Sequence, residues 1–331
     1  MSISTVSRAL NDRPDASDTT REKVRKAASD LGYFANHSGR SLRSGVTGSV
    51  GFVIQTSHSL TGQGDTFFMA VFDGMQSVLS RHQLDLIALL CPATDDPTEY
   101  VRRIVSRGFV DGLVISHTRK VDPRIPLLAS RDVPFVALGR SDTDAGHAWI
   151  DLDFEAMAQR TIDRFVAQGH SRIAVALQRD VNFSRIFLAS AKRAIEGHAM
   201  TLDPELVFHS SASEGGGYTV ARKLLTSAER PTAIAVSSEA MITGIYRGLV
   251  EAGCKPGRDI AIIGRDSSTT QFLTPRLTSF HVNLHDLGVA LGEALLALMP
   301  AYRNDYPLGV VRRLFATRFI QGESDRYAPR S

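Results

Sequence analysis

Apolar and polar positions between residues 49 and 264 follow a regular succession of strand-like and helix-like patterns. Short apolar runs predict buried strands, and the stretches between them carry apolar residues at helical spacing. Strands that are apolar throughout are typical of parallel sheets covered by helices on both faces. Because the succession occurs twice, we expect two doubly wound α/β lobes that bind a ligand beyond the carboxyl ends of their strands. The predicted strands are Ser49–Ile54, Leu84–Leu90, Val110–Ser116, Pro134–Gly139, Arg172–Leu177, Leu206–His209, Ala233–Val236 and Ile260–Gly264, and the predicted helices are Phe67–Arg81, Thr98–Ser106, Asp122–Ser130, Phe154–Ala167, Arg185–Gly197, Gly216–Ser227 and Ala240–Ala252.

Two further segments extend this pattern. Residues 148–152 are expected to link the two series of elements, and residues 313–320 to form one last strand. No helix with leucine heptads follows that strand, so we expect no tetramerising coiled coil.

The first 32 residues have the pattern of two short amphipathic helices. In residues 2–11, Val6 and Leu10 share one face and a serine can cap the start. In the second helix, residues 19–22 fit a capping box and Gly32 ends the apolar stripe. Helices this short cannot bury a core by themselves, so they need a third helix or a partner surface.

The formal charge of the chain is concentrated in this N-terminal segment. Residues 1–45 carry eight Lys and Arg against five Asp and Glu, and their excess of +3 equals the net charge of the whole chain. The remaining residues are therefore neutral overall. A basic excess among hydroxyl-bearing residues indicates contacts with nucleic-acid phosphates, although a solvated helical face would give the same pattern.

Five short motifs occur in order across residues 2–51. They are S-I-S-T-V-S-R-A-L-N, T-R-E-K-V, L-G-Y, R-S-L and T-G-S-V-G. Together they resemble the DNA-binding headpiece of the LacI/GalR family of bacterial transcription regulators, and the resemblance continues to the C-terminus. It implies an effector-responsive repressor of carbohydrate-utilisation genes that binds palindromic operator DNA as a homodimer.

The resemblance also implies which residues contact DNA. Residues 1–36 match the helix-turn-helix headpiece and residues 37–45 the hinge helix, whose leucine enters the minor groove as a wedge. Leu42 matches that leucine, although a flexible linker that happens to contain a leucine would give the same sequence pattern. Base readout is expected at Ile3, Ser4 and Arg8. The full set of implied DNA contacts is Ser2, Ile3, Ser4, Thr5, Ser7, Arg8, Asn11, Tyr33, Arg40, Ser41 and Leu42.

The headpiece departs from the family in one respect. In the family, another helix and its turn precede the helix that matches residues 2–11, whereas this chain starts at Met1. We expect a start position assigned too late, and the alternative is a truncated protein with weakened DNA binding. The in-frame sequence upstream of Met1 would distinguish the two.

For residues 46–331 the resemblance implies a periplasmic-binding-protein-like core in which the chain crosses three times between the lobes. The crossings are expected near Gly169, Val282 and Arg312. Lobe one would then comprise residues 46–168 and 283–310, and lobe two residues 169–282 and 311–331. A dimer of such cores places two headpieces on two operator half-sites.

Aromatic and polar residues after the strands are candidates for effector binding. Phe67 and Phe68 lie in a segment similar to the family's N-P-F-F, and they either stack on a ligand or fill the core at a helix start. Ser116 and His117 follow the third strand, where the histidine either binds a ligand or is solvated. Trp149 is either a flat platform for a pyranose or core filler.

Other candidates come from the resemblance itself. Asp153 occupies the place of the aspartate in the family's D-N-x-x-G. Ser238 and Glu239 replace the family's Asn-Asp, and both can hydrogen-bond a ligand. Asp266 lies in a G-R-D-S turn at the family's effector-binding carboxylate, although it could also be a loop or capping carboxylate. Phe187 stands where many members have an arginine that contacts the effector. Because that arginine is replaced, and Arg185 alone could reach its space, we expect a neutral, hydroxyl-rich ligand such as a sugar.

The sequence lacks the motifs of the common enzyme classes. It has no G-x-G-x-x-G after a strand, no P-loop, no G-x-S-x-G and no H-E-x-x-H, so no catalytic residue, cofactor or metal is expected. Asp151 and Asp153 could form an acid–base pair, but binding and structural roles are favoured. Cys91 and Cys254 are expected to be free thiols in a reducing cytoplasm, because neither a secretory signal nor a membrane span is recognised. The alternative to a regulator is a cytoplasmic sugar sensor that has lost DNA binding.

Overall fold

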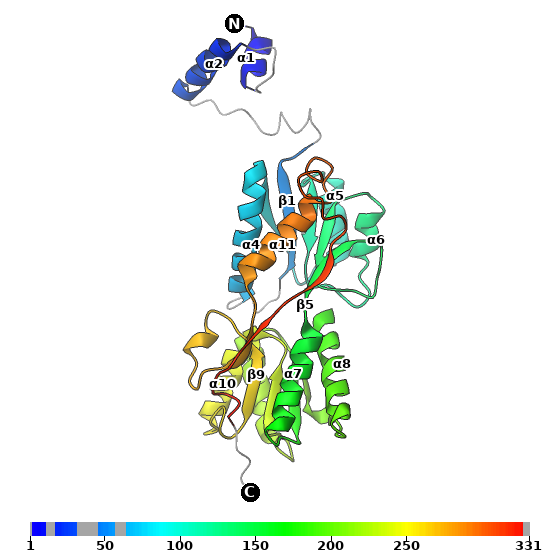
Figure 1. Ribbon diagram of the computed structural model, residues 1–331, viewed down its shortest axis with the longest axis vertical. Helices are drawn as coiled ribbons and strands as arrows, with labels where there is room; N and C mark the ends of the chain where they lie inside the picture. The colour runs from blue at the N-terminus through cyan, green and yellow to red at the C-terminus, as the bar shows by residue number, and fades with distance from the viewer. Residues whose placement is uncertain (1, 11–16, 32–45, 57–63, 327–331) are drawn as a thin grey trace. The chain divides into compact units, whose positions relative to one another are not determined.

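The computed structural model describes residues 2–10, 17–31, 46–56 and 64–326 (Figure 1). The chain divides into two units, Met1–Thr47 and Gly48–Ser331, each of which is described by itself. Of the residues expected to contact DNA, Asn11, Tyr33, Arg40, Ser41 and Leu42 lie outside the described part. The side chains of Ile3, Ser4 and Ser7 are not described either.

The N-terminal unit contains helices α1 (Ile3–Leu10) and α2 (Asp18–Asp30). The hydroxyl of Ser2 accepts a hydrogen bond from the Thr5 N–H at 3.2 Å, which is the expected serine cap of α1. The expected capping box at residues 19–22 is wrong, because Ser17 is the N-cap of α2, two residues before Thr19, and its side chain makes no hydrogen bond to the helix backbone. Val6, Ala9 and Val24 pack together between the two helices. This small apolar contact holds the pair.

Lobe one is built on a parallel six-stranded sheet of order β11-β5-β4-β3-β1-β2. Its helices cover both faces, with α4 and α11 on one side and α5 and α6 on the other (Figure 1). The strands are β1 (Ser49–Gln55), β2 (Asp85–Cys91), β3 (Gly112–Ile115), β4 (Phe135–Leu138), β5 (Ala148–Leu152) and β11 (Arg312–Phe315), and the helices are α4 (Gly64–Leu79), α5 (Pro97–Ser106), α6 (Arg124–Ala129) and α11 (Leu284–Leu296), with a 3-10 turn at Ser80–His82.

Helices α4 and α11 approach each other closely because two glycines face the partner backbone. A Cβ added to Gly74 would lie 1.9 Å from the carbonyl oxygen of His285, and one added to Gly288 would lie 2.0 Å from that of Val71. No side chain fits at those distances. The pair therefore depends on glycine at both positions.

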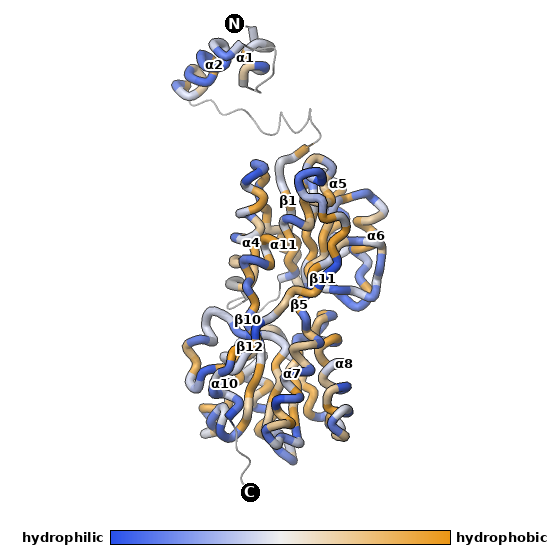
Figure 2. Tube along the Cα trace, in the orientation of Figure 1, coloured by the Kyte–Doolittle hydropathy of each residue, from blue (hydrophilic) through white to orange (hydrophobic). Residues whose placement is uncertain are grey.

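Lobe two is built on a sheet of order β12-β10-β9-β8-β6-β7, in which only β12 is antiparallel to its neighbour. Helices α7 and α8 cover one face, and α9 and α10 the other. The strands of both lobes are mostly hydrophobic, as Figure 2 shows. The strands are β6 (Ile173–Gln178), β7 (Val207–Ser210), β8 (Ala233–Val236), β9 (Ala261–Arg265), β10 (Thr278–His281) and β12 (Arg318–Ile320), the helices are α7 (Phe154–Ala167), α8 (Asn182–Gly197), α9 (Glu214–Thr226) and α10 (Ile242–Glu251), and 3-10 turns lie at Pro204–Leu206, Glu239–Met241 and Thr270–Phe272.

The expected fold class, two parallel-sheet α/β lobes, is confirmed, but two of the crossings lie elsewhere than expected. Because α7 packs on α8 of lobe two, the first crossing is at Asp153 and not near Gly169. The segment expected as one strand, 313–320, is two strands, and the crossing is the Ala316–Thr317 break between them. Residues 154–168 thus belong to lobe two and residues 311–315 to lobe one.

Candidate functional site

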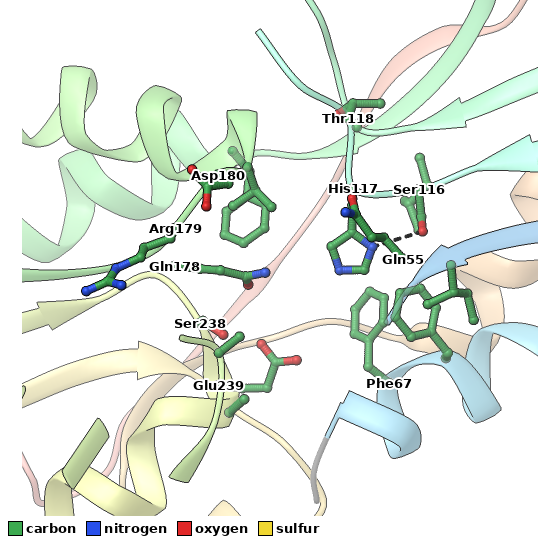
Figure 3. A pocket seen from close by; sticks show the side chains of 18 of the residues that line it. Gln55, Phe67, Ser116, His117, Thr118, Gln178, Arg179, Asp180, Ser238 and Glu239 are labelled. Atoms are coloured by element: carbon green, nitrogen blue, oxygen red, sulfur yellow. Dashed lines mark hydrogen bonds between the residues drawn. The ribbon is translucent and has the colours of Figure 1, made fainter. Parts of the chain in front are cut away.

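A cavity of about 450 Å³ lies between the two lobes, at the carboxyl ends of their parallel strands (Figure 3). Lobe one contributes residues that follow β1, β3 and β4, and lobe two residues that follow β6 and β8. In Figure 3 the side chains of Gln55, Phe67 and His117 face those of Gln178 and Glu239 across the open space. A ligand in this space would touch both lobes.

Aromatic rings form much of the cavity wall. Phe67 and Phe68, at the start of α4, both line it, and their ring centroids lie 5.2 Å apart, edge to face. Phe68 also contacts Phe52 of the lobe-one core. On the other side, Phe154 and Phe183 stack with their centroids 4.7 Å apart. The second pair was not expected from the sequence, because it joins two helices, α7 and α8, whose packing a single sequence does not reveal.

The lobe-one wall carries a histidine held in one tautomer. The hydroxyl of Ser116 donates to the carbonyl of Val53 at 2.9 Å, so His117 Nδ1, at 3.1 Å from that hydroxyl oxygen, must be the donor to it. Desolvation, together with the nearby charge of Arg124, lowers the pKa of His117 to about 4. The ring is therefore neutral at pH 7, and its Nε2 is a hydrogen-bond acceptor.

A buried ion pair positions this histidine. Arg124 and Asp122 lie 2.7 Å apart, and neither is more than 3% exposed. The Arg124 guanidinium also donates to the carbonyl of Ser116 at 3.0 Å and to that of His117 at 3.3 Å. These bonds fix the turn at His117, whose φ of +52° is unusual for a residue other than glycine.

The lobe-two wall carries a second buried ion pair, between Glu239 and Arg265. Their side chains are only 9% and 10% exposed. The Arg265 guanidinium lies over the ring of Phe67, 5.0 Å from its centroid, and so contacts lobe one. Among the residues that the structure describes, its Nε has no hydrogen-bond partner. Ser238, which precedes Glu239, is buried in the same wall.

Four of the eight candidate effector-binding residues line the cavity, namely Phe67, Phe68, Ser116 and Ser238. The other four do not. Asp153 caps α7 by accepting from the Ala156 N–H, and Phe187 is buried in the core. Trp149 packs against the lobe-one core, with the Arg140 guanidinium 5.8 Å from its ring centroid.

Asp266, the fourth of these residues, faces a neighbouring cavity. Its carboxylate lies 3.0 Å from Nδ1 of His281 on β10. Burial raises the pKa of Asp266, while the hydrogen bond with His281 acts in the opposite direction. The family turn is therefore present, but its carboxylate is held by a neighbouring strand and does not line the larger cavity.

Hydrogen bonds bridge the lobes at one rim of the cavity. The Asn182 backbone N–H donates to the Thr118 carbonyl at 3.0 Å, and the Asn182 side-chain amide donates to the Arg140 carbonyl at 2.7 Å. Arg185, one turn further along α8, pairs with Asp142 of lobe one at 2.7 Å. Arg185 thus contacts the opposite lobe and does not line the cavity.

Among the residues that the structure describes, no helix combines the length and the apolar character that a membrane span requires. Within the same residues, no cluster of three or more His, Cys, Asp or Glu side chains is arranged to hold a metal ion. Cys91 and Cys254 are buried free thiols.

A small helical unit followed by two α/β lobes around a ligand-sized cavity is the architecture of a ligand-responsive DNA-binding regulator. Residues 1–36 match the model of bacterial regulatory proteins of the lacI family, and residues 162–324 match that of the periplasmic binding protein-like domain. The regulator RafR of Escherichia coli is 30% identical over 263 residues, which cover 78% of this chain and 76% of that protein. The regulator AglR of Rhizobium meliloti strain 1021 is 29% identical over 314 residues, covering 93% and 87%. The chain therefore belongs to the LacI family and is a DNA-binding transcriptional regulator, as its motifs predicted.

Solved structures share the fold. A complex of the transcriptional regulator CelR with cellobiose aligns with a TM-score of 0.74 and 24% identity over 97% of this chain and 95% of that one. The lac repressor dimer bound to operator and the anti-inducer ONPF aligns with a TM-score of 0.82 and 21% identity over 98% and 96%. At this identity the comparison supports the fold alone.

Proposed function

We propose that this regulator represses carbohydrate-utilisation genes, binds its operator as a homodimer, and takes a neutral sugar in the cavity between the lobes. The observation that carries the proposal is that aromatic and polar groups of both lobes face one space. Phe67 and Phe68 offer apolar surface to the C–H face of a sugar ring. His117 Nε2 and the Glu239 carboxylate are acceptors for its hydroxyl groups.

The charge of the cavity wall favours a neutral ligand. Arg265 is a buried cation of the wall, and Glu239 already neutralises it. His117 is uncharged at pH 7 because its pKa is near 4. Arg179 and Asp180 also line the cavity and carry opposite charges, so the described part of the wall holds no excess of positive charge, and a polyol finds both donors and acceptors there. The cellobiose of the CelR complex is a ligand of this chemical class.

Effector binding would act on DNA through lobe closure. A ligand that touches both lobes stabilises one relative position of them, and the three chain crossings transmit that position to the dimer. The expected coupling between effector and operator is about 1–3 kcal/mol, or roughly 5–150-fold in affinity. On the DNA side, the proposed base-reading residues are Ile3, Ser4 and Arg8, with Leu42 as the minor-groove wedge.

We further propose that the chain is not an enzyme and that it works in the cytoplasm, where its operator is. The two carboxylates considered as an acid–base pair have other partners: Asp151 pairs with Arg140 at 2.9 Å, and Asp153 caps α7. Neither is thus poised to move a proton to a ligand.

The test is isothermal titration calorimetry of the full chain with neutral mono- and disaccharides, followed by operator binding of the same samples. The proposal expects saturable binding of at least one neutral sugar, with one site per chain. Binding of nucleosides or carboxylates alone would contradict the sugar assignment. A protein that binds sugar but prefers no DNA sequence would be the sugar sensor considered as the alternative.

A further inference from the structure

The edge strand β11 of the lobe-one sheet has backbone groups that no neighbouring strand uses. β11, labelled in Figure 2, is the last strand of the sheet and pairs on one side only, in parallel with β5, where Arg312 lies beside Trp149. The Trp149 N–H donates to the Val311 carbonyl at 2.9 Å, so the backbone groups of alternate residues of β11 face β5. Those of Arg312 and Leu314 therefore face outward, and within the described part of the chain they have no hydrogen-bond partner.

Apolar side chains are exposed along the same edge. Leu308 and Val310, just before β11, are 52% and 51% exposed, and Leu314 within it is 41% exposed. Leu314 and Arg313 lie on opposite faces of the sheet, because side chains alternate along a strand. Trp149 pairs with the residue two before Leu314, so it lies on the same face, and its side chain is only partly buried. One face of this edge is therefore apolar.

The segment that contains this edge is basic. Residues 303–318 carry four arginines against one aspartate, whereas the chain after residue 45 is neutral overall. Arg312 pairs with Asp144 at 2.6 Å. Arg303 and Arg313 are exposed, and the described part of the chain supplies neither with an ion pair. The strand at the opposite edge of the sheet, β2, contains no arginine or lysine, so the basic character distinguishes β11.

Charge decides between the possible occupants of this edge. Two β11 strands side by side would bring Arg312 and Arg313 of one chain close to those of the other, and like charges on neighbouring strands are destabilising. Arginine on an edge strand thus disfavours pairing with a second copy. The same charges attract an acidic segment. Nucleic acid fits less well, because a phosphate backbone offers no apolar partner to the exposed Leu308, Val310 and Leu314.

We propose that β11 is a docking edge for another protein, which adds an extended segment of alternating acidic and apolar residues to the lobe-one sheet. In such strand addition the outward backbone groups of Arg312 and Leu314 bond to the main chain of the partner. The alternation follows from strand geometry, since the acidic side chains lie on the face of Arg313 and the apolar ones on the face of Leu314 and Trp149. Residues 308–315 do not line the cavity between the lobes, so this docking depends on neither the sugar nor the function proposed above.

The test is fluorescence anisotropy of a labelled peptide of alternating glutamate and valine, acetylated and amidated, titrated with the full chain. We expect saturable binding with one site per chain, and a change in the emission of Trp149, the only tryptophan of the sequence. The same peptide with lysine in place of glutamate should bind at least tenfold more weakly. The glutamate peptide N-methylated throughout should do the same, because it keeps the side chains but lacks the backbone donors.

Two variants place the peptide on this edge. Arg313→Glu should bind the glutamate peptide at least tenfold more weakly than the parent does, and the lysine peptide more tightly. Arg222→Glu, exposed on α9, is the matched control and should bind both peptides as the parent does. Leu314→Pro removes one outward N–H at a position where an edge strand tolerates proline, and should bind the glutamate peptide at least tenfold more weakly.

Several results would overturn the docking edge. They are the absence of saturable binding of the glutamate peptide, equal affinity for the N-methylated peptide, and parent-like binding by Arg313→Glu. A smaller assembly of Arg313→Glu than of the parent in sedimentation velocity would show that a second copy covers the edge. Weaker binding of unrelated duplex DNA by that variant, with no peptide binding by the parent, would assign the edge to nucleic acid.

Discussion

The Arg265 guanidinium, in lobe two, lies over the ring of Phe67, in lobe one, 5.0 Å from its centroid. The same guanidinium pairs with Glu239 in its own lobe. One side chain therefore joins the buried charge of one lobe to the aromatic wall of the other. Any ligand that moves Phe67 or Glu239 must also move this contact, which makes the pair a physical link between cavity occupancy and lobe position.

Glu239→Gln should weaken sugar binding at least tenfold, because it keeps the shape of the side chain but removes the charge that accepts from sugar hydroxyls and neutralises Arg265. It should also lower the free energy of unfolding by roughly 3 kcal/mol, since Arg265 would remain buried without its carboxylate. Calorimetry and urea unfolding measure the two effects. Glu251→Gln, at an exposed ion pair with Arg247, is the control and should leave the free energy of unfolding close to that of the parent. Parent-like sugar affinity in Glu239→Gln would show that the Glu239 carboxylate does not contribute to sugar binding.

Asn182→Ala should weaken effector binding several-fold, mainly through faster dissociation. Its side-chain amide donates across the rim of the cavity to the Arg140 carbonyl, and this bond favours the closed arrangement. A hydrogen bond of this kind contributes about 0.5–1.5 kcal/mol. Stopped-flow dissociation of the sugar complex measures the change. Arg193→Gln, exposed on the same helix, should dissociate like the parent, and an unchanged rate in Asn182→Ala would show that the rim bond does not hold the lobes together.

Gly74→Ala should destabilise the protein by 3 kcal/mol or more, roughly as for other severely overpacked core positions. Its Cβ would lie 1.9 Å from the His285 carbonyl oxygen, so α4 and α11 would have to separate. The matched control is Gly197→Ala at the end of α8, where an added Cβ meets nothing within 4 Å. That variant should be neutral or slightly more stable, because alanine favours a helix. Equal unfolding midpoints for the two variants would contradict the close packing.

His170 should make stability depend on pH. Burial lowers its pKa to about 4, below the ordinary value of 6.5, so between these pH values the unfolded chain binds more protons than the folded one. Its contribution to stability is complete above pH 6.5 and is lost as pH falls toward 4, by up to about 3 kcal/mol. His170→Gln should flatten that part of the profile, whereas the exposed control His209→Gln should leave it unchanged. A profile as steep in His170→Gln as in the parent would assign the effect to other groups.

Local patterns in the sequence were sufficient for most elements of the fold. Phe154–Ala167 and Ala233–Val236 have the bounds that periodicity predicted, because each carries its own apolar pattern. The split of residues 313–320 between two sheets was not predictable, since it depends on which neighbours pair with each half. Strand β10 and helix α11 were not predicted at all. β10 (Thr278–His281) and α11 (Leu284–Leu296) lie directly on either side of the second crossing, where only the crossing itself was expected.

The site was predictable only where strand ends or the family resemblance indicate it. Phe67 and Ser116 were found because they follow strands whose carboxyl ends meet, and Ser238 was found through the family resemblance. The Glu239–Arg265 pair and the Phe154–Phe183 stack join residues far apart in the sequence, and nothing local indicates them. Asp266 has the family position but a different partner, because His281 lies beside it on the neighbouring strand.

The most direct test of the proposed function is operator affinity measured with and without the sugar that calorimetry selects. Fluorescence anisotropy of labelled operator, titrated with the full chain, gives both dissociation constants at one salt concentration. The account predicts that saturating sugar changes the operator constant by roughly 5–150-fold, and that Glu239→Gln requires at least tenfold more sugar for the same change. An operator constant that stays the same in saturating sugar would contradict it.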